Sequence, residues 1–161
     1  MGNEARRLEE QIGELLSQRG WTVAVAESCT GGLLGHRITN VPGSSAYFQG
    51  GVVSYSAEAK ERILGVPHGV LAEHGAVSKE TALAMAQGVR RIFSTDIALS
   101  VTGIAGPAGG TPEKPVGLVY IGLATEGVAL WEKHTWEGNR SENKELSAEA
   151  SLKLLLKYLT R

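Results

Sequence analysis

The hydrophobic residues of this chain follow two spacings, one typical of helices and one typical of short strands. Apolar residues recur at helical spacing in segments that we expect to be helices, at 4–19, 33–39, 78–93 and 141–159. Short apolar runs predict strands at 21–26, 52–55, 97–102, 118–125 and 128–136, the last two forming a hairpin around Glu126-Gly127. The alternation of helices and strands predicts an α/β fold, a three-layer α/β/α sandwich with a mixed, mostly parallel sheet.

Turn and cap residues divide these elements. Gly20 ends the first helix, and Pro42 follows the end of the second. Ser56 precedes a short capped helix, and Ser78 caps the long helix that comes later. Between these two helices, residues 65–76 are expected to be irregular with about one helical turn. The long helix is expected to face the core with Leu83, Ala86, Val89 and Ile92.

Three turns rich in polar residues or glycine follow predicted strands. They come after Ala26, after Val53 and after Val101. In open α/β sheets, ligands bind outside the carboxyl ends of the parallel strands. We therefore expect the three turns to meet in space and to form the functional site.

The first of these turns reads Glu27-Ser28-Cys29-Thr30 and is followed by two glycines and a helix. The first backbone N–H groups of a helix have no intrahelical partner and lie at the positive end of its dipole. An anion or a developing oxyanion is favoured there. Ser28 is therefore the candidate reacting group. The alternative is that Ser28 only caps the helix, because serine is a preferred cap.

Charge and composition narrow the class of partner. The formal net charge is −1 and the sequence has no dense run of lysine and arginine, which argues against nucleic acid and against a membrane surface as partners. The 42% hydrophobic content is ordinary, whereas 21 glycines is a high number that indicates many turns and close backbone approaches. We expect a single domain over residues 1–161, no membrane span and a small-molecule partner.

Cysteine use indicates the compartment. The single cysteine cannot form an internal disulfide, and the sequence has no CxxC pair or Cys/His cluster at zinc spacing. A reducing, cytoplasmic location fits this, and the charged N-terminus does not read as a signal sequence. We expect no metal and no cofactor, and a homo-oligomer is left open.

The longest segment without helical or strand pattern is 103–117. Eight of the fifteen residues in GIAGPAGGTPEKPVG are glycine or proline. A loop of this length in a compact domain is either functional or disordered. It can be part of a site, a flexible surface lid, or both.

Four motifs together resemble the CinA C-terminal domain family, the nicotinamide-nucleotide amidases. They are AESCTGG, GSSAYFQGGVVSYSAEAKERILGV, HGAVS and SVTGIAGPAGGTPEKPVGLVYIGLA, and the resemblance runs from about residue 5 to the C-terminus. It implies a metal-independent amidohydrolase that converts nicotinamide mononucleotide (NMN) to nicotinate mononucleotide and ammonia in pyridine-nucleotide recycling. It also implies a fold similar to an anticodon-binding domain, with five strands. Activities of the larger N-terminal domain found in some members are not assigned to this chain.

The resemblance includes a catalytic set of Ser28, Tyr55 and Lys60. It implies that Ser28 attacks the carboxamide, while Lys60 and Tyr55 transfer protons or orient the amide. Lys60 must be uncharged to act as a base, which requires burial or nearby positive potential. Without the resemblance, Lys60 reads as a solvated helix lysine and Tyr55 as a half-buried strand aromatic.

A second set of residues is expected to bind either the oxyanion or the substrate phosphate, and the sequence does not divide the two roles among them: Thr30, Gly31, Thr102 and Gly103. Arg140 is a candidate phosphate clamp, because a guanidinium fork matches phosphate oxygens. Family members often show Gly-Asp-Arg followed four residues later by another Arg, whereas this chain has Asn139 and Lys144. We expect these departures to bear on substrate affinity.

Other interpretations stay open. Cys29 could be the nucleophile of a cysteine amidase, since a thiol beside a helix N-terminus can have a lowered pKa, or it could be a small apolar filler. Glu27 could be a base, or could hold Lys60 or a backbone amide. The chain could instead be a non-catalytic nucleotide- or protein-binding module linked to competence or DNA damage. An acyl-enzyme and direct attack by water are both compatible with the sequence.

Overall fold

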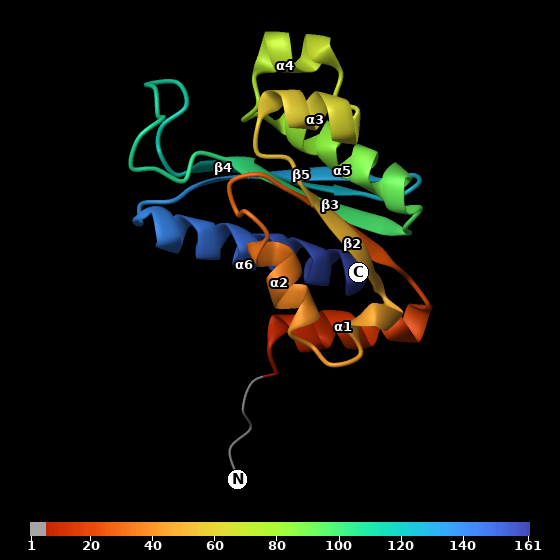
Figure 1. The fold of residues 1–161 in the computed structure, drawn as a ribbon. Coiled ribbons are helices and arrows are strands. Elements are labelled where there is room, and N and C mark those ends of the chain that lie inside the picture. Colours follow the sequence, from red (N-terminus) through yellow and green to blue (C-terminus); the bar gives the residue numbers. More distant parts are fainter. Residues whose placement is uncertain (1–5) are drawn as a thin grey trace.

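The computed structural model describes residues 6–161, in which a five-stranded sheet lies between two layers of helices (Figure 1). The elements follow in chain order: α1 (Leu8–Arg19), β1 (Val23–Glu27), α2 (Leu33–Thr39), the 3₁₀ turn η1 (Ser44–Ala46), β2 (Phe48–Val53), α3 (Ala57–Leu64), α4 (His68–His74), α5 (Lys79–Phe93), β3 (Ile97–Gly103), β4 (Leu118–Ala124), β5 (Ala129–Thr135) and α6 (Arg140–Leu159).

The strand order is β2-β1-β3-β4-β5. Strands β2, β1 and β3 are parallel, and β4 is antiparallel to both β3 and β5. Four of the five strands therefore point the same way, which confirms the predicted mixed, mostly parallel sheet. Strand β3 is the third in the order and is buried along its length, as a central strand covered on both faces should be.

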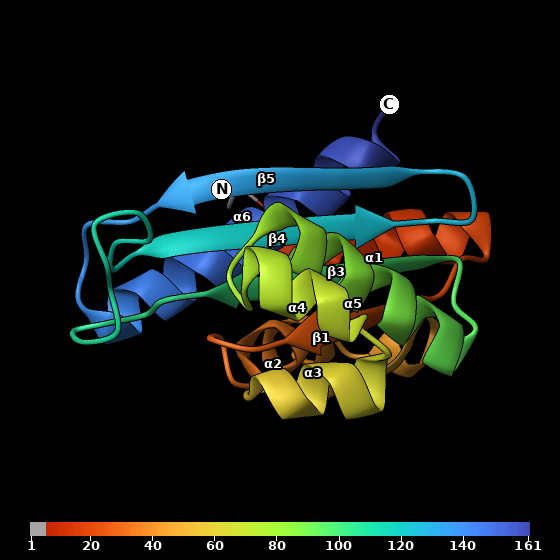
Figure 2. The same ribbon diagram turned by 90° about the horizontal axis from the view of Figure 1, so that it is seen from above.

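Helices cover both faces of the sheet (Figures 1 and 2). Helices α1, α2 and α6 lie on one face, where the larger core packs α1 and α6 against β1, β3 and β4. Helices α3, α4 and α5 lie on the other, and only α5 of these packs broadly on the strands. The predicted three-layer sandwich is confirmed. Among residues 6–161, none of the helices combines the length and the hydrophobicity that a membrane span requires.

The helix ends follow the cap residues. Gly20 adopts φ 66° at the end of α1, in the left-handed region that favours glycine. The side chains of Ser56 and Ser78 accept backbone N–H groups at the starts of α3 and α5, as predicted. Asn139 caps α6 in a capping box with Glu142. The predicted start of the first helix at residue 4 lies outside the described residues.

Two predicted elements differ from the structure. Strand β2 begins at Phe48, earlier than predicted, because pairing with β1 holds the Gly50-Gly51 segment extended despite the low strand propensity of glycine. A Cβ atom on Gly51 would lie 2.8 Å from Val25, so this close pairing needs glycine. Helix α4 spans seven residues where about one turn was expected.

The predicted core face of α5 was wrong at its end. Ala86 and Val89 are buried, whereas the side chain of Ile92 is 48% exposed and Met85 is buried. The predicted stripe advances by three residues at each step. Each residue turns the helix by about 100°, so three residues fall about 60° short of a full turn, and the stripe moves around the helix by that angle at each step. By Ile92 the predicted stripe has therefore rotated away from the sheet.

Candidate active site

The carboxyl ends of β1, β2 and β3 lie side by side, which confirms the expected meeting of the three turns. The N–H group of Ser28 donates to the carbonyl oxygen of Val101 at 3.0 Å. The N–H group of Ser54 donates to the carbonyl oxygen of Glu27 at 2.8 Å. These two bonds fix the turn after β1 between the ends of its two neighbours.

A hollow of about 220 Å³ opens at this edge of the sheet. Its lining combines the turn after β1, the segment after β2, the loop after β3 and the start of α6: Ser28, Cys29, Tyr55, Gly103, Ile104, Ala105, Gly106, Ala108, Gly109 and Arg140. The glycine-rich loop therefore forms a wall of the hollow. The sequence signal for this role was the density of glycine and proline in residues 103–117, although the pattern did not single out Ala105 or Ala108.

Lys60 reaches from α3 under the turn to Ser28. Its Nζ atom lies 2.8 Å from the Oγ atom of Ser28 and 2.7 Å from the carbonyl oxygen of Ser54. The exposed fractions are 1% for Lys60 and 6% for Ser28. Lys60 is therefore a buried group that contacts Ser28, which rules out the solvated helix lysine. Sequence reasoning missed the part of Ser54, whose carbonyl gives the amine its second partner.

Burial lowers the pKa of Lys60 from 10.5 to about 8, while the neighbouring Cys29 opposes this. No carboxylate among the described residues forms an ion pair with Lys60 at 4.0 Å or less. With a pKa of about 8, roughly one tenth of the amine is neutral at pH 7, against roughly one in 3,000 at the ordinary value. A neutral amine can donate to Ser54 and accept the hydroxyl proton of Ser28.

Glu27 occupies the start of α2. Its carboxylate accepts hydrogen bonds from the hydroxyl of Thr30 at 2.6 Å and from three backbone N–H groups, those of Gly32, Leu34 and Gly35, at 2.9–3.2 Å. The expectation that these helix N–H groups are free for an external anion is therefore wrong, because the protein supplies its own anion. Among the roles considered for Glu27, the structure shows the one in which it holds backbone amides.

Arg140 connects two walls of the hollow. Its guanidinium donates to the carbonyl oxygen of Gly106 at 2.8 Å and to the hydroxyl of Tyr55 at 2.9 Å. Tyr55 follows β2 and is 61% exposed, so the expected half-buried strand aromatic was wrong. Tyr55 is exposed because β2 ends two residues earlier and the chain turns toward α3.

The second predicted set is divided by the structure. Gly103 lines the hollow, whereas Thr30, Gly31 and Thr102 do not. The hydroxyl of Thr30 donates to Glu27, the N–H of Gly31 donates to Ser28, and the hydroxyl of Thr102 donates to the carbonyl oxygen of Ala76. The hydroxyl groups of Thr30 and Thr102 and the N–H group of Gly31 are therefore engaged within the protein.

Cys29 lines the hollow but is 6% exposed. Burial raises the pKa of its thiol to about 12, despite the nearby Lys60 and Lys144. A thiol with this pKa is almost wholly protonated at neutral pH and is a poor nucleophile. The structure thus favours Cys29 as a small apolar residue.

Asn139 and Lys144, the two residues near Arg140 that differ from the common pattern, have different consequences. Asn139 caps α6 and does not line the hollow. The Nζ atom of Lys144 lies beside Gly31: a Cβ atom added to Gly31 would lie 3.7 Å from it. Lys144 therefore keeps a positive charge close to the turn after β1, one helical turn from Arg140.

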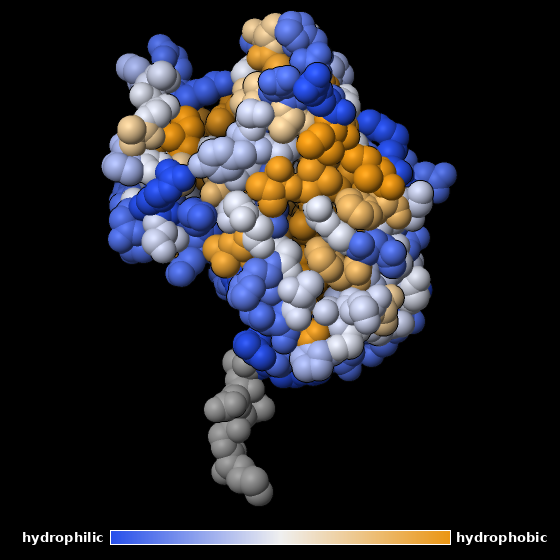
Figure 3. Space-filling view, in the orientation of Figure 1, coloured by the Kyte–Doolittle hydropathy of each residue, from blue (hydrophilic) through white to orange (hydrophobic). Residues whose placement is uncertain are grey.

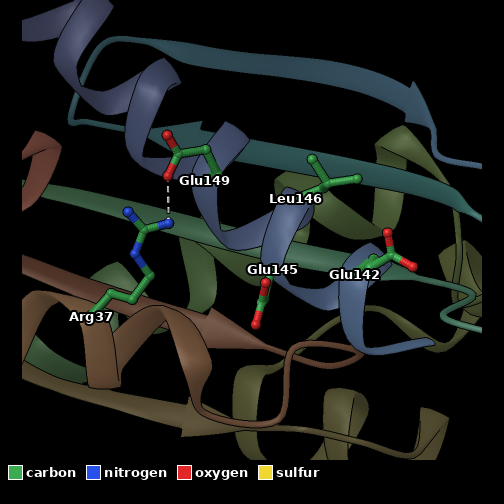
Figure 4. Close-up of a pocket in the computed structure, with 5 residues that line it drawn as sticks. All are labelled: Arg37, Glu142, Glu145, Leu146 and Glu149. Carbon is green, nitrogen blue, oxygen red and sulfur yellow. Dashed lines mark ion pairs between the residues drawn. The ribbon is translucent and has the colours of Figure 1, made fainter. Parts of the chain in front are cut away.

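A larger hollow of about 500 Å³ lies elsewhere, between α2 and α6 (Figure 4). It is lined by Arg37, Glu142, Glu145, Leu146 and Glu149. Arg37 is already paired with Glu149 at 2.6 Å and with Glu9 at 2.5 Å. The remaining carboxylates make this hollow unfavourable for an anion, and its lining has no nucleophile. No group of three or more metal-ligating side chains was found among residues 6–161.

The family model of the CinA C-terminal domain matches residues 5–159. A curated relative from Halothermothrix orenii, whose name refers to competence-damage induction, is 54% identical over 98% of this chain and 38% of its own length. A CinA-like protein from Chloroherpeton thalassium is 53% identical over 94% of this chain and 37% of its own length. The chain thus spans less than two fifths of these relatives.

Solved structures match over nearly their whole length. The competence damage-inducible protein A from Klebsiella pneumoniae has a TM-score of 0.93 and 32% identity, with 96% of both chains covered. The competence/damage inducible protein CihA from Agrobacterium tumefaciens has a TM-score of 0.90 and 37% identity, with 100% of both chains covered. The arrangement of helices and strands described above is therefore shared with these proteins.

Proposed function

The chain belongs to the CinA C-terminal domain family, and on this premise we propose that it is a metal-independent amidohydrolase that deamidates NMN. The observation that carries the proposal is the buried contact between Lys60 and Ser28, 2.8 Å long. A serine hydroxyl needs a neighbouring base to become a nucleophile. A desolvated amine without a carboxylate partner is suited to that task near neutral pH.

The first half of the reaction forms an ester. Neutral Lys60 takes the hydroxyl proton of Ser28 while the Oγ atom bonds to the carboxamide carbon, and the carbonyl electron pair moves to the oxygen. The N–H of Cys29 donates to no backbone carbonyl oxygen among the described residues and is the candidate donor to this oxyanion. The carbon–nitrogen bond then breaks, and the proton held by Lys60 goes to the departing nitrogen, which leaves as ammonia.

The second half releases the acid. A water molecule gives its proton to Lys60 and attacks the ester carbon, and Ser28 takes the proton back as the carbon–oxygen bond breaks. The products are nicotinate mononucleotide and the free serine. Tyr55 lines the same hollow and is held by Arg140, so it can orient the amide or relay a proton.

The charges around the hollow are compatible with an anionic substrate. Arg140 lines the hollow and Lys144 lies near the adjoining turn. No carboxylate is among the residues that line the hollow. A phosphate could therefore pair with Arg140 in place of the contacts that this side chain makes with Tyr55 and Gly106.

The test is release of ammonia from NMN by the purified protein, with nicotinamide and nicotinamide riboside as comparison compounds. We expect ammonia and nicotinate mononucleotide in equal amounts, with the mononucleotide preferred. Binding of NMN in a calorimeter without any release of ammonia would contradict the proposal and would favour the non-catalytic binding module. Accumulation of an ester on Ser28, seen by mass spectrometry after rapid quenching, would distinguish the acyl-enzyme route from direct attack by water.

A further inference from the structure

One wall of the hollow beside Ser28 contains a buried N–H group without a partner on the protein backbone. Gly106 belongs to the glycine-rich loop 103–117, is buried and lines the hollow. Its N–H group donates to no backbone carbonyl oxygen among residues 6–161. The great majority of buried backbone N–H groups in proteins are hydrogen-bonded. A buried N–H group that borders a hollow and lacks such a bond indicates a place for an acceptor on a ligand.

Asn143 on α6 fixes the direction of this N–H group. Its side chain is buried, donates from Nδ2 to the carbonyl oxygen of Ala105 at 3.0 Å and accepts the N–H group of Gly138 at 3.0 Å. The carbonyl of Ala105 and the N–H of Gly106 belong to one trans peptide unit, in which the two groups point in opposite directions. Because Asn143 holds the carbonyl, the N–H of Gly106 points away from Asn143 and is left to the hollow.

Helix α6 also holds the next carbonyl of the loop. The guanidinium of Arg140, three residues before Asn143 on the same helix, donates to the carbonyl oxygen of Gly106 at 2.8 Å. Successive carbonyls of an extended chain point to opposite sides, so two in a row that face one helix require a bend. Gly106 provides it with φ 87°, and a Cβ atom there would collide with the side chain of Val116.

The surroundings of the Gly106 N–H group favour an anion. Arg140 lines the same hollow and is the first residue of α6, where the helix dipole is positive. No carboxylate is among the lining residues. Hydrophilic residues gather at the left of the space-filling view, where the glycine-rich loop and the start of α6 lie (Figure 3). A backbone N–H group beside a guanidinium is suited to the oxygens of a phosphate.

We infer that Asn143 is a positioning residue for the phosphate of the substrate. By holding the carbonyl of Ala105, it directs the N–H group of Gly106 toward the phosphate that Arg140 binds. This rests on the proposed function, because it places the phosphate of NMN in the hollow beside Ser28. Asn143 itself does not line the hollow and acts only through the peptide unit between Ala105 and Gly106.

The first test uses the wild-type protein and inorganic phosphate, so it needs neither a variant nor turnover. In NMR spectra of the labelled protein, the amide proton of Gly106 should shift downfield and saturate as phosphate is added, because it becomes a donor to a charged oxygen. An unchanged Gly106 signal in a protein that hydrolyses NMN would overturn the inference and leave the proposed function intact. A saturating shift in a protein that does not hydrolyse NMN would support the phosphate site and contradict the proposed function alone.

The second test separates positioning from a purely structural role. Asn143→Leu removes both side-chain bonds without adding charge, whereas Asn143→Asp keeps an acceptor for Gly138 and places an oxygen opposite the carbonyl of Ala105. Ser151→Ala is the matched control, because Ser151 is also buried on α6 and bonds to a backbone carbonyl, that of Ser147, without lining the hollow. Circular dichroism checks that each variant is folded.

Both Asn143 variants should raise KM for NMN about tenfold and weaken the binding of inorganic phosphate by a similar factor. They should change kcat for NMN, and KM for nicotinamide riboside, by less than about twofold, because the nucleoside has no phosphate. Ser151→Ala should match the wild-type protein. An equal rise in KM for nucleotide and nucleoside, or a fall in kcat without a rise in KM, would overturn the inference, since Asn143 would then support the fold or the reacting carboxamide.

Discussion

The Nζ atom of Lys60 lies 2.8 Å from the Oγ atom of Ser28, and both side chains are buried. The two residues are 32 positions apart and come from different strand ends. The other partner of the amine is the carbonyl oxygen of Ser54, which is also uncharged. Burial among neutral partners explains why the ammonium form is disfavoured. The predictions below follow from this relationship and from the groups around it.

The pH dependence of the reaction should report Lys60. Because its pKa is lowered to about 8 and the base must be neutral, kcat/KM for NMN should rise with pH and level off above about 8. The measurement is the initial rate of ammonia release in a series of buffers at constant ionic strength. A rate that falls steadily as the pH rises through this range would contradict a lysine base.

Stability should depend on the same ionisation. The pKa of Lys60 is about 8 in the folded protein, against the ordinary value of 10.5 that applies to the unfolded chain. Between these two pH values the unfolded chain binds more protons than the folded protein. The free energy of unfolding should therefore increase with pH over this range. Relative to Lys60→Met, the wild-type protein should gain up to about 3 kcal/mol over this window. Urea unfolding of both proteins at several pH values measures the difference. Parallel curves would mean that Lys60 is not desolvated.

The sequence was sufficient for most of the architecture. Buried strands such as 97–102, and helices with serine caps at Ser56 and Ser78, carry strong local signals, so their structure matched the prediction. Strand β2 was placed too late because its first half is FQGG, whose strand conformation depends on pairing with β1. Such pairing is a property of the folded chain and leaves no local pattern.

The candidate site was only partly predictable. In open α/β sheets, ligands bind outside the carboxyl ends of the parallel strands, and this rule predicted that the three turns meet. The turns that contain Ser28 and Gly103 also indicated these two residues. The burial of Lys60 was not visible, because a lysine on a short polar helix usually faces solvent. Binding of backbone amides was one of the roles considered for Glu27, but the sequence did not select it, since it depends on the side chain folding back across the turn. The signal was a carboxylate placed just before free helix N–H groups.

Cys29→Ala should leave the release of ammonia within about twofold of wild type, because burial keeps the thiol protonated with a pKa of about 12. The small cavity should lower the free energy of unfolding by about 1 kcal/mol. The assay is ammonia release combined with urea unfolding. Loss of activity in a folded Cys29→Ala protein would favour the cysteine amidase instead.

Arg140→Ala should raise KM for NMN at least about tenfold while changing KM for nicotinamide riboside much less, because the nucleoside lacks the phosphate that the guanidinium would bind. Arg62→Ala is a suitable control, since Arg62 is exposed on α3 and does not line the hollow. An equal rise in KM for NMN and for nicotinamide riboside would mean that Arg140 holds Tyr55 and Gly106 in place and does not bind the phosphate.

The central claim is that the Ser28 hydroxyl and the Lys60 amine together hydrolyse the carboxamide. The most direct measurement is ammonia release from NMN by wild type, Ser28→Ala and Lys60→Met, with folding checked by circular dichroism. Removal of the nucleophile or of its base should each lower kcat by about 10³-fold or more, and the double variant should be little worse than either single one, because the two residues act as a unit. Release at the wild-type rate by a folded Ser28→Ala or Lys60→Met protein would contradict the account.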